Sequence, residues 1–189
     1  VGIEGMWKRV IAGHYGLVPK ISQLVQANAV EGYNIPQGIL TNFYRAVAGR
    51  RPGVLTKVGL GTFVDPRIEG GKTNERAKED LVDVVTLSGE EWIFMKSFPL
   101  NVALIRGTTA DSAGNISFER EILTIDGLAM ATAVHNSGGV VIVQVERVAA
   151  KGTLKPKDVK IPGILVDYVV VSEPQYHMQT FATQFSPVF

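Results

Sequence analysis

The sequence has 189 residues, of which 46% are apolar and 20% are charged, and its formal net charge is +1. These proportions are those of an ordinary folded domain and exclude a disordered chain. Because the chain has no cysteine, it can form no disulfide framework, thiolate nucleophile or thiolate zinc site. The near-neutral charge argues against nucleic-acid binding, and no apolar run reaches the ~18 residues of a membrane span. We expect a cytoplasmic protein that binds neither nucleic acid nor membrane.

The two ends of the sequence look like cuts or processing points. The first residue is Val1 rather than methionine, and the last, Phe189, lies within an aromatic-rich stretch. A length of 189 residues fits one domain. We expect residues 1–172 to form that domain and residues 173–189 to connect it to a further part of a longer protein.

The first third of the chain predicts two helices, each followed by a short extended segment. Apolar residues recur at helical spacing over residues 19–29 and again over residues 37–48. Residues 33–35 are expected to be extended because Pro36 disfavours helical geometry in the residue before it. Residues 54–58 predict a buried strand.

The middle of the chain predicts a surface loop and a hairpin. Residues 65–80 are polar and contain two adjacent glycines, which favours a long surface loop. Residues 81–87 and 91–98 are rich in strand-forming side chains, and the dipeptide Ser88-Gly89 between them is typical of a tight turn. An antiparallel hairpin is therefore expected here.

The last third alternates apolar strands with an alanine-rich helix. Strands are predicted at residues 102–105, 140–145 and 164–171, with a polar turn at 111–115 and a helix at 127–136. Near-continuous apolar strands are typical of parallel sheets that are buried on both faces. The whole pattern predicts an α/β fold, with a mostly parallel sheet, flanking helices and an antiparallel hairpin insertion.

Two glycine-containing segments are candidates for a binding cleft. Gly59-Leu60-Gly61-Thr62 follows a predicted strand, where ligands of open α/β sheets bind and where glycine lets the backbone approach them. A plain turn would have the same sequence. Gln37 and Gly38 stand where a strand passes into a helix, whose free amides attract anions. The alternative there is an exposed glutamine at a helix start.

The other candidates are weaker. The histidines His14, His135 and His177 lack metal-ligand spacing, so we predict no metal site and expect structural or surface roles. Residues 71–73 (GKT) resemble the end of a phosphate-binding loop, but Pro66 stands where the earlier glycine is required. The lysine-rich residues 151–160 favour a solvated loop.

Carboxylates give no acid–base pair by their spacing. Glu119 and Glu146 lie at predicted strand or turn ends, where solvation or ion pairing is expected. The residues alone therefore indicate an α/β domain with a plausible cleft and no nucleophile.

Several longer segments carry a resemblance to a known family. They are residues 55–67 (LTKVGLGTFVDPR), 69–72 (EGGK), 33–38 (YNIPQG), 8–11 (KRVI) with 13–16 (GHYG), 106–111 (RGTTAD) with 114–116 (GNI), and 145–148 (VERV) with 162–167 (PGILVD). Together these segments resemble the family I CoA-transferases, above all the bacterial acetate or propionate CoA-transferases. The likeness covers nearly the whole chain.

The resemblance implies two related α/β domains, of which this chain would be the first, lacking its glycine-rich start. It implies transfer of CoA between short-chain carboxylic acids through a glutamyl-CoA thioester, with coenzyme A as a substrate and no cofactor. The glutamate would lie in the second domain, so no catalytic residue is expected here and the chain alone should be inactive. Acyl-CoA thioesters, short-chain carboxylates, the second domain and copies of the same chain are the implied partners.

The resemblance also assigns residues to one side of the cleft. Gln37 would orient the reacting thioester, and Gly38 together with the loop residues Gly59, Gly61, Thr62 and Phe63 would line the same cleft. Sugar-phosphate isomerases share this fold, so a related isomerase is one rival interpretation. The other is a non-catalytic domain that binds CoA or only assembles with a partner.

Overall fold

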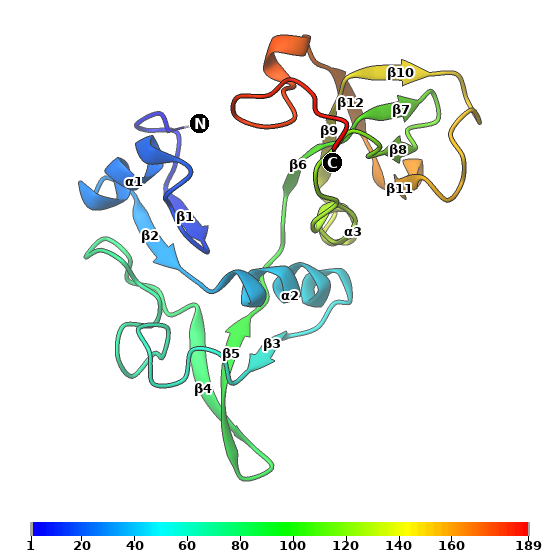
Figure 1. Cartoon of the computed structure of the whole chain (residues 1–189). Helices are drawn as coiled ribbons and strands as arrows, with labels where there is room; N and C mark the ends of the chain where they lie inside the picture. Colours follow the sequence, from blue (N-terminus) through cyan, green and yellow to red (C-terminus); the bar gives the residue numbers. More distant parts are fainter. Residues whose placement is uncertain (1, 189) are drawn as a thin grey trace. The chain divides into compact units, whose positions relative to one another are not determined.

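A computed structural model describes residues 2–188 of the chain (Figure 1). Its internal contacts divide it into two compact units. The first runs up to Ala46 and resumes at Arg51–Phe98, and the second comprises Val47–Arg50 and the chain from Pro99 onward. The predicted division at residue 172 stays a prediction, and residues 173–188 pack within the second unit through contacts described below.

The first unit opens with a parallel strand pair joined by a helix. Strand β1 (Arg9–Ala12) pairs with β2 (Glu31–Asn34), and α1 (Pro19–Gln26) connects them. Proline is favoured at the first helical position, where α1 has Pro19. The helix ends earlier than the predicted residue 29, and Asn28 adopts a left-handed φ of 56° two residues beyond it.

Helix α2 (Gln37–Ala48) has the predicted bounds and turns its apolar face, with Ile39 and Phe43, into the core. Strand β3 (Gly53–Thr56) follows it. The predicted hairpin is confirmed as β4 (Val82–Leu87) and β5 (Glu90–Lys96), and β3 joins it in an antiparallel sheet of order β3-β5-β4. Ser88 and Gly89 both have positive φ, as a tight hairpin turn requires.

Residues 65–80 form a loop without helix or strand, as predicted, and most of its residues are exposed, but a few of them are buried. Asp65 is 1% exposed and Ala77 3% exposed. The segment is tied to the preceding elements because the Asn74 side-chain amide donates hydrogen bonds to the carbonyls of Val25 (2.8 Å) and Val30 (2.7 Å). The predicted surface loop is therefore anchored to the first unit by a few buried or hydrogen-bonded residues.

The second unit contains the predicted parallel sheet. Strands β6 (Val102–Arg106), β9 (Val140–Val145) and β12 (Tyr168–Val171) lie in the order β12-β9-β6, with α3 (Gly127–Asn136) beside them (Figure 1). Alternate strand residues pack with α3 in the buried core. This core contains Ala103, Ile105, Val141, Val143, Val145, Ala131 and Val134.

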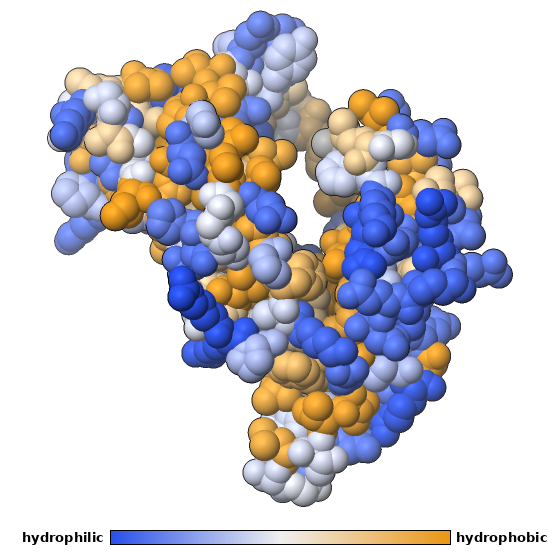
Figure 2. Space-filling view, turned by 180° about the vertical axis from the view of Figure 1, so that it is seen from behind, coloured by the Kyte–Doolittle hydropathy of each residue, from blue (hydrophilic) through white to orange (hydrophobic). Residues whose placement is uncertain are grey.

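Burial on both faces of this sheet, as predicted for its strands, is not found within the described chain. Leu104 is 76% exposed and Tyr168 61% exposed, and both pair in register with Ile142 of the central strand. The predicted strand at 164–171 is also shorter, because a 3-10 turn, η1 (Gly163–Leu165), precedes β12. Figure 2 shows that apolar residues reach the surface in several patches on the face it displays.

Four short strands make a further sheet in the second unit. They are β7 (Thr109–Asp111), β8 (Ile116–Ser117), β10 (Arg147–Ala149) and β11 (Val159–Ile161), in the order β10-β7-β8-β11. The predicted turn at 111–115 is confirmed, since an Asp111 carboxylate oxygen accepts the N–H groups of Ala113 and Asn115. A second 3-10 turn, η2 (Pro174–Tyr176), follows β12. The predicted α/β class with parallel strands and a hairpin insertion is confirmed.

Candidate functional site

Gln37 is the first residue of α2 and is exposed. Strand β2 leads into it through Ile35, whose N–H bonds to the Ala12 carbonyl at 3.0 Å, and Pro36, whose carbonyl accepts the first helical hydrogen bonds. The side-chain amide of Gln37 makes no hydrogen bond within residues 2–188. Its donor and acceptor are therefore available to a ligand at the start of the helix.

Gly13 lies directly against this glutamine. A Cβ atom at Gly13 would stand 2.6 Å from Gln37 Oε1, which is closer than real Cβ atoms pack, and 3.2 Å from Gln37 Cβ, which is tight. The missing side chain at Gly13 therefore leaves the space that the Gln37 amide occupies. Sequence reasoning placed Gly13 in a family-like segment but gave it no role.

The glycine-rich loop after β3 is a chain of tight turns. Gly59 has a φ of 100° and Gly61 a φ of 69°, which side chains of L residues rarely adopt. The Thr62 N–H and hydroxyl both donate to the Gly59 carbonyl, at 3.1 and 2.8 Å. Phe63, which follows, is 44% exposed. The loop thus presents Thr62 and Phe63 on a fixed backbone.

Asp65 holds this loop in place. Its buried carboxylate accepts hydrogen bonds from the Gly61 N–H at 2.9 Å and from Nε and Nη2 of Arg67 at 2.9 and 2.8 Å. The Arg67 guanidinium, followed by the Gly61 N–H, keeps the pKa of the Asp65 carboxyl well below its usual range. Arg67 also binds both oxygens of Glu91 on β5. Sequence reasoning missed this support, because nothing in a polar run shows which acid is buried.

The structure brings only part of the predicted set to one surface feature. Gly38 lines a groove of about 770 Å³, together with Val58, the residue immediately before Gly59. Gln37, Gly59, Gly61, Thr62 and Phe63 are not among the residues that line the groove. The glycine loop therefore begins at the edge of the groove, and Gln37 precedes its helical wall.

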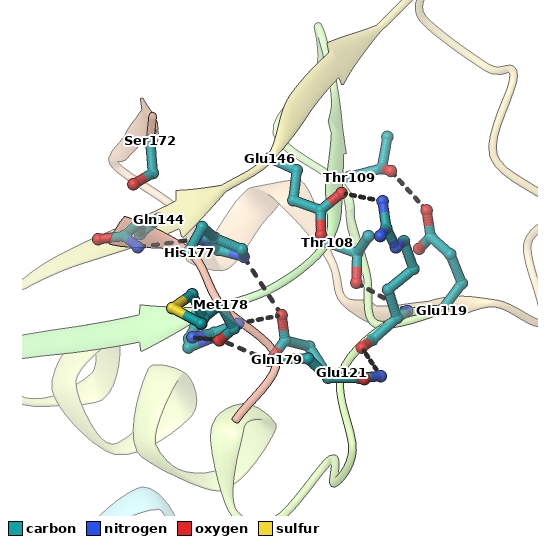
Figure 3. A network of polar contacts seen from close by, with 12 residues as sticks. Thr108, Thr109, Glu119, Glu121, Gln144, Glu146, Ser172, His177, Met178 and Gln179 are labelled. Carbon is teal, nitrogen blue, oxygen red and sulfur yellow. Dashed lines mark hydrogen bonds and ion pairs between the residues drawn. The ribbon is translucent and has the colours of Figure 1, made fainter. Parts of the chain in front are cut away.

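A second polar cluster lies in the second unit, where the segment after β12 crosses the ends of the parallel strands (Figure 3). His177 is 3% exposed and lies between Gln144 (Nδ1, 2.9 Å) and Glu121 (Nε2, 3.3 Å). Arg106, at the end of β6, pairs with Glu121 at 2.9 Å and donates to the Met178 carbonyl at 2.8 Å. These contacts fix the segment to the sheet.

Two glutamates of this cluster form ion pairs with arginines. Glu146 pairs with Arg120 at 2.9 Å, and Glu119 pairs with Arg147 at 2.9 Å, which confirms the expected ion pairing. Burial alone would raise the pKa of Glu119. Hydrogen bonds from the Ser117 and Thr109 hydroxyls outweigh this effect, so the pKa is lowered overall. The lining of a pocket of about 170 Å³ includes Arg120, Arg147 and Glu146, all of which take part in these ion pairs.

Metal and membrane sites find no support in the part of the chain that the structure covers. No group of three or more histidine, aspartate or glutamate side chains could hold a metal ion among residues 2–188. His14 and His135 are exposed, and His177 is buried in the polar cluster. None of the helices in the described range is long and apolar enough to cross a membrane.

Parallel strand pairs with connecting helices, together with an antiparallel hairpin sheet, place the chain in the α/β class. The sequence profile of the Coenzyme A transferase family matches residues 2–172, and the chain belongs to that family.

Relatives of known name agree with this assignment. The chain is 53% identical to caffeate CoA-transferase of Acetobacterium woodii over 100% of its length, which is 36% of that protein. It is 48% identical to an acetate CoA-transferase of Escherichia coli K12, over 91% of this chain and 32% of that protein. The chain thus spans about a third of the length of these relatives.

A solved structure gives the same result for the fold. An acyl-CoA transferase from Escherichia coli O157:H7, in a thioester complex with CoA, has a TM-score of 0.91 and 46% sequence identity. The match covers 96% of this chain and 35% of that chain.

Proposed function

We propose that this chain forms one side of the active site of an enzyme that transfers CoA between carboxylic acids. The observation that carries the proposal is the exposed Gln37 amide, free of hydrogen bonds within the described residues and accommodated by Gly13. The family match over residues 2–172 and the high identity to named CoA-transferases support it.

The proposed chemistry is covalent catalysis by a glutamate that lies outside these 189 residues. Its carboxylate attacks the acyl-CoA thioester, the C–S bond breaks, and an acyl-glutamyl anhydride and CoA thiolate form. The thiolate then attacks the glutamyl carbonyl, which releases the first carboxylate and leaves a glutamyl-CoA thioester. A second carboxylate takes the CoA by the reverse sequence.

In this scheme Gln37 donates a hydrogen bond from its side-chain amide to the oxygen that becomes negative when the thioester is attacked. Amide donors fixed toward a developing oxyanion stabilise the transition state more than the ground state. Gly38 and the loop residues Gly59, Gly61, Thr62 and Phe63 border the same cleft. Coenzyme A is a substrate, and no separate cofactor is needed.

The isomerase-like alternative needs a carboxylate base beside the loop. Asp65 is the carboxylate that contacts the loop, and it is buried and bonded to Arg67 and Gly61. A carboxylate that is buried and bonded to an arginine in this way is a poor general base. This favours the transferase over the isomerase. A cytoplasmic location, a second domain and assembly into homo-oligomers belong to the same proposal.

The substitution Gln37→Ala in the complete enzyme tests the role of the amide. We expect kcat for CoA transfer to fall about 100-fold, as for other oxyanion donors, while KM for the acyl-CoA changes much less. Gln23→Ala, at an exposed glutamine of α1, is the control. Equal losses in kcat and in acyl-CoA affinity would instead assign Gln37 to ground-state binding.

A further inference from the structure

The groove of about 770 Å³ lies wholly within the first unit, between α2 and β3. Its lining includes Gly38, Asn42, Arg51, Leu55, Val58 and Phe94. Gly38, at one end, is the sequence neighbour of Gln37, the residue proposed to face the reacting thioester, and Gln37 itself is not a lining residue. A ligand attached to that thioester could extend from Gly38 along the helix.

One wall of the groove is apolar. Leu55 is 44% exposed and Val58 is 59% exposed, although both are aliphatic. Phe94, on the neighbouring strand β5, is partly buried behind them. Covering these side chains with an apolar ligand would remove their surface from water, which is favourable in proportion to the area covered.

Polar groups are also present along the groove. The Asn42 Nδ2 atom donates to the Gly38 carbonyl at 2.8 Å, which leaves the Asn42 side-chain oxygen as an acceptor. The exposed guanidinium of Arg51 forms no ion pair with any residue of the described chain, so it can receive an anion. Arginine suits carboxylates because its planar fork matches their two oxygens.

The groove is larger than a two-carbon acid. Gly38 and Arg45 both line the groove, and seven helical rises separate them by about 10 Å along α2. A volume of about 770 Å³ lies in the range of pockets that enclose drug-sized ligands. An acetyl group would leave most of this space to water.

From these observations we propose that the groove binds the body of an extended carboxylic acid. This acid has an aryl or medium-length alkyl body against Leu55 and Val58, and a hydrogen-bonding or anionic far end near Asn42 and Arg51. The inference rests on the proposed function, because only a thioester held beside Gln37 directs the acyl group into the groove at Gly38. It names the substrate class of that same site.

The test uses the complete enzyme with propionyl-CoA as the donor and compares two acceptors, acetate and 3-(4-hydroxyphenyl)propionate. Leu55→Trp fills the groove from an outward-facing position. We expect the ratio of kcat/KM for the aryl acid to kcat/KM for acetate to fall at least ten-fold. Leu87→Trp, at an exposed leucine of β4 outside the groove, is the control and should change this ratio less than two-fold.

An unchanged ratio in Leu55→Trp overturns the proposal, as does a wild-type enzyme that accepts acetate but not the aryl acid. A raised KM for propionyl-CoA with an unchanged ratio also overturns it, because the groove would then hold part of CoA. If the wild type transfers CoA to neither acid, the proposed function itself fails.

Arg51→Gln keeps the proposal testable where Leu55→Trp does not fold. Its side chain is exposed, so the fold does not depend on it. The preference for adipate over hexanoate as acceptor should fall at least five-fold. An unchanged preference would contradict a role for Arg51 at the far end of the substrate.

Discussion

Gly13 and Gln37 form a matched pair in which a missing side chain makes room for an amide. A Cβ on Gly13 would lie 2.6 Å from Gln37 Oε1, although the two positions are 24 residues apart in the sequence. Strand β1 ends one residue before Gly13, and α2 begins at Gln37. The parallel pairing of β1 with β2 therefore brings the glycine to the start of the helix.

Gly13→Ala is expected to displace the Gln37 amide and to slow CoA transfer about ten-fold or more, because small misplacements of catalytic groups are costly. Stability should change by about 1 kcal/mol at most, since the severe overlap is with the end of a flexible side chain and Gln37 Cβ need give way by only a few tenths of an ångström. Kinetics and thermal unfolding measure the two effects. Gly16→Ala is the control, as its Cβ would meet its nearest neighbour, His14 Nδ1, at 3.8 Å. Equal activity of both variants would contradict the pairing.

Asp65 should make stability depend on pH in the acidic range. Its pKa is depressed in the folded state by Arg67 and the Gly61 N–H, so its stabilising contribution is present above the unfolded pKa, near 4. This contribution is lost as the pH falls toward the lower folded pKa. Asp65→Asn should therefore flatten the fall of the urea midpoint below pH 4, measured by fluorescence.

Glu69→Gln provides the matched control for Asp65→Asn. Glu69 lies in the same segment, is exposed, and its carboxylate has no partner within residues 2–188. Its replacement should leave the acid dependence of the urea midpoint as in the wild type. An Asp65→Asn profile parallel to the wild-type profile would show that this carboxylate does not hold the loop in its charged form.

The two loop glycines should differ in their tolerance of a side chain. Gly61→Ala meets open space but must adopt a positive φ, which costs about 1–2 kcal/mol. Gly59→Ala has a φ of 100° and would also place its Cβ 3.0 Å from Val64 Cβ, so it should cost more. Chemical denaturation orders the two variants, and a larger loss of stability for Gly61→Ala would be incompatible with this geometry.

Gly38→Ala, with ordinary φ and open space, should be neutral or stabilising by up to about 1 kcal/mol.

His177 should hold the segment after β12 against the second unit. His177→Ala removes the contacts to Gln144 and Glu121, so we expect chymotrypsin to cleave faster near the exposed Tyr176 and Phe181. A buried hydrogen bond of this kind contributes about 1 kcal/mol, which predicts roughly five-fold faster cleavage from an opened state. His135→Ala, at an exposed histidine of α3, should behave as the wild type. No difference between the variants would mean that other contacts suffice.

Helices and turns that depend on neighbouring residues in the sequence were predicted correctly. Helix α2 and helix α3 have the expected bounds because apolar spacing and flanking residues define them, and the hairpin follows from Ser88-Gly89. The strand expected at 164–171 failed because a tertiary contact intervenes. Gly163 passes so close to Ala113 that a Cβ would lie 2.1 Å from its carbonyl oxygen, and the chain turns there instead.

The candidate site shows the same limit. Gln37 and the glycine loop are visible as short segments, whereas their supports, Gly13 and Asp65, act through contacts with other parts of the chain. Burial of Asp65 depends on Arg67 and on the path of the backbone, which no spacing rule expresses. The exposed face of the parallel sheet could not be predicted either. Valine and leucine occur in a strand whether one or both of its faces are covered.

Intact-protein and peptide mass spectrometry of the complete enzyme after incubation with an acyl-CoA tests whether CoA is carried by a glutamate outside this chain. We expect a CoA thioester adduct that disappears when a carboxylic acid is added and that maps to a glutamate outside these 189 residues. The 189-residue chain alone should acquire no adduct and transfer no CoA. An adduct on a residue within the chain, or turnover by the chain alone, would show that the nucleophile lies within these 189 residues.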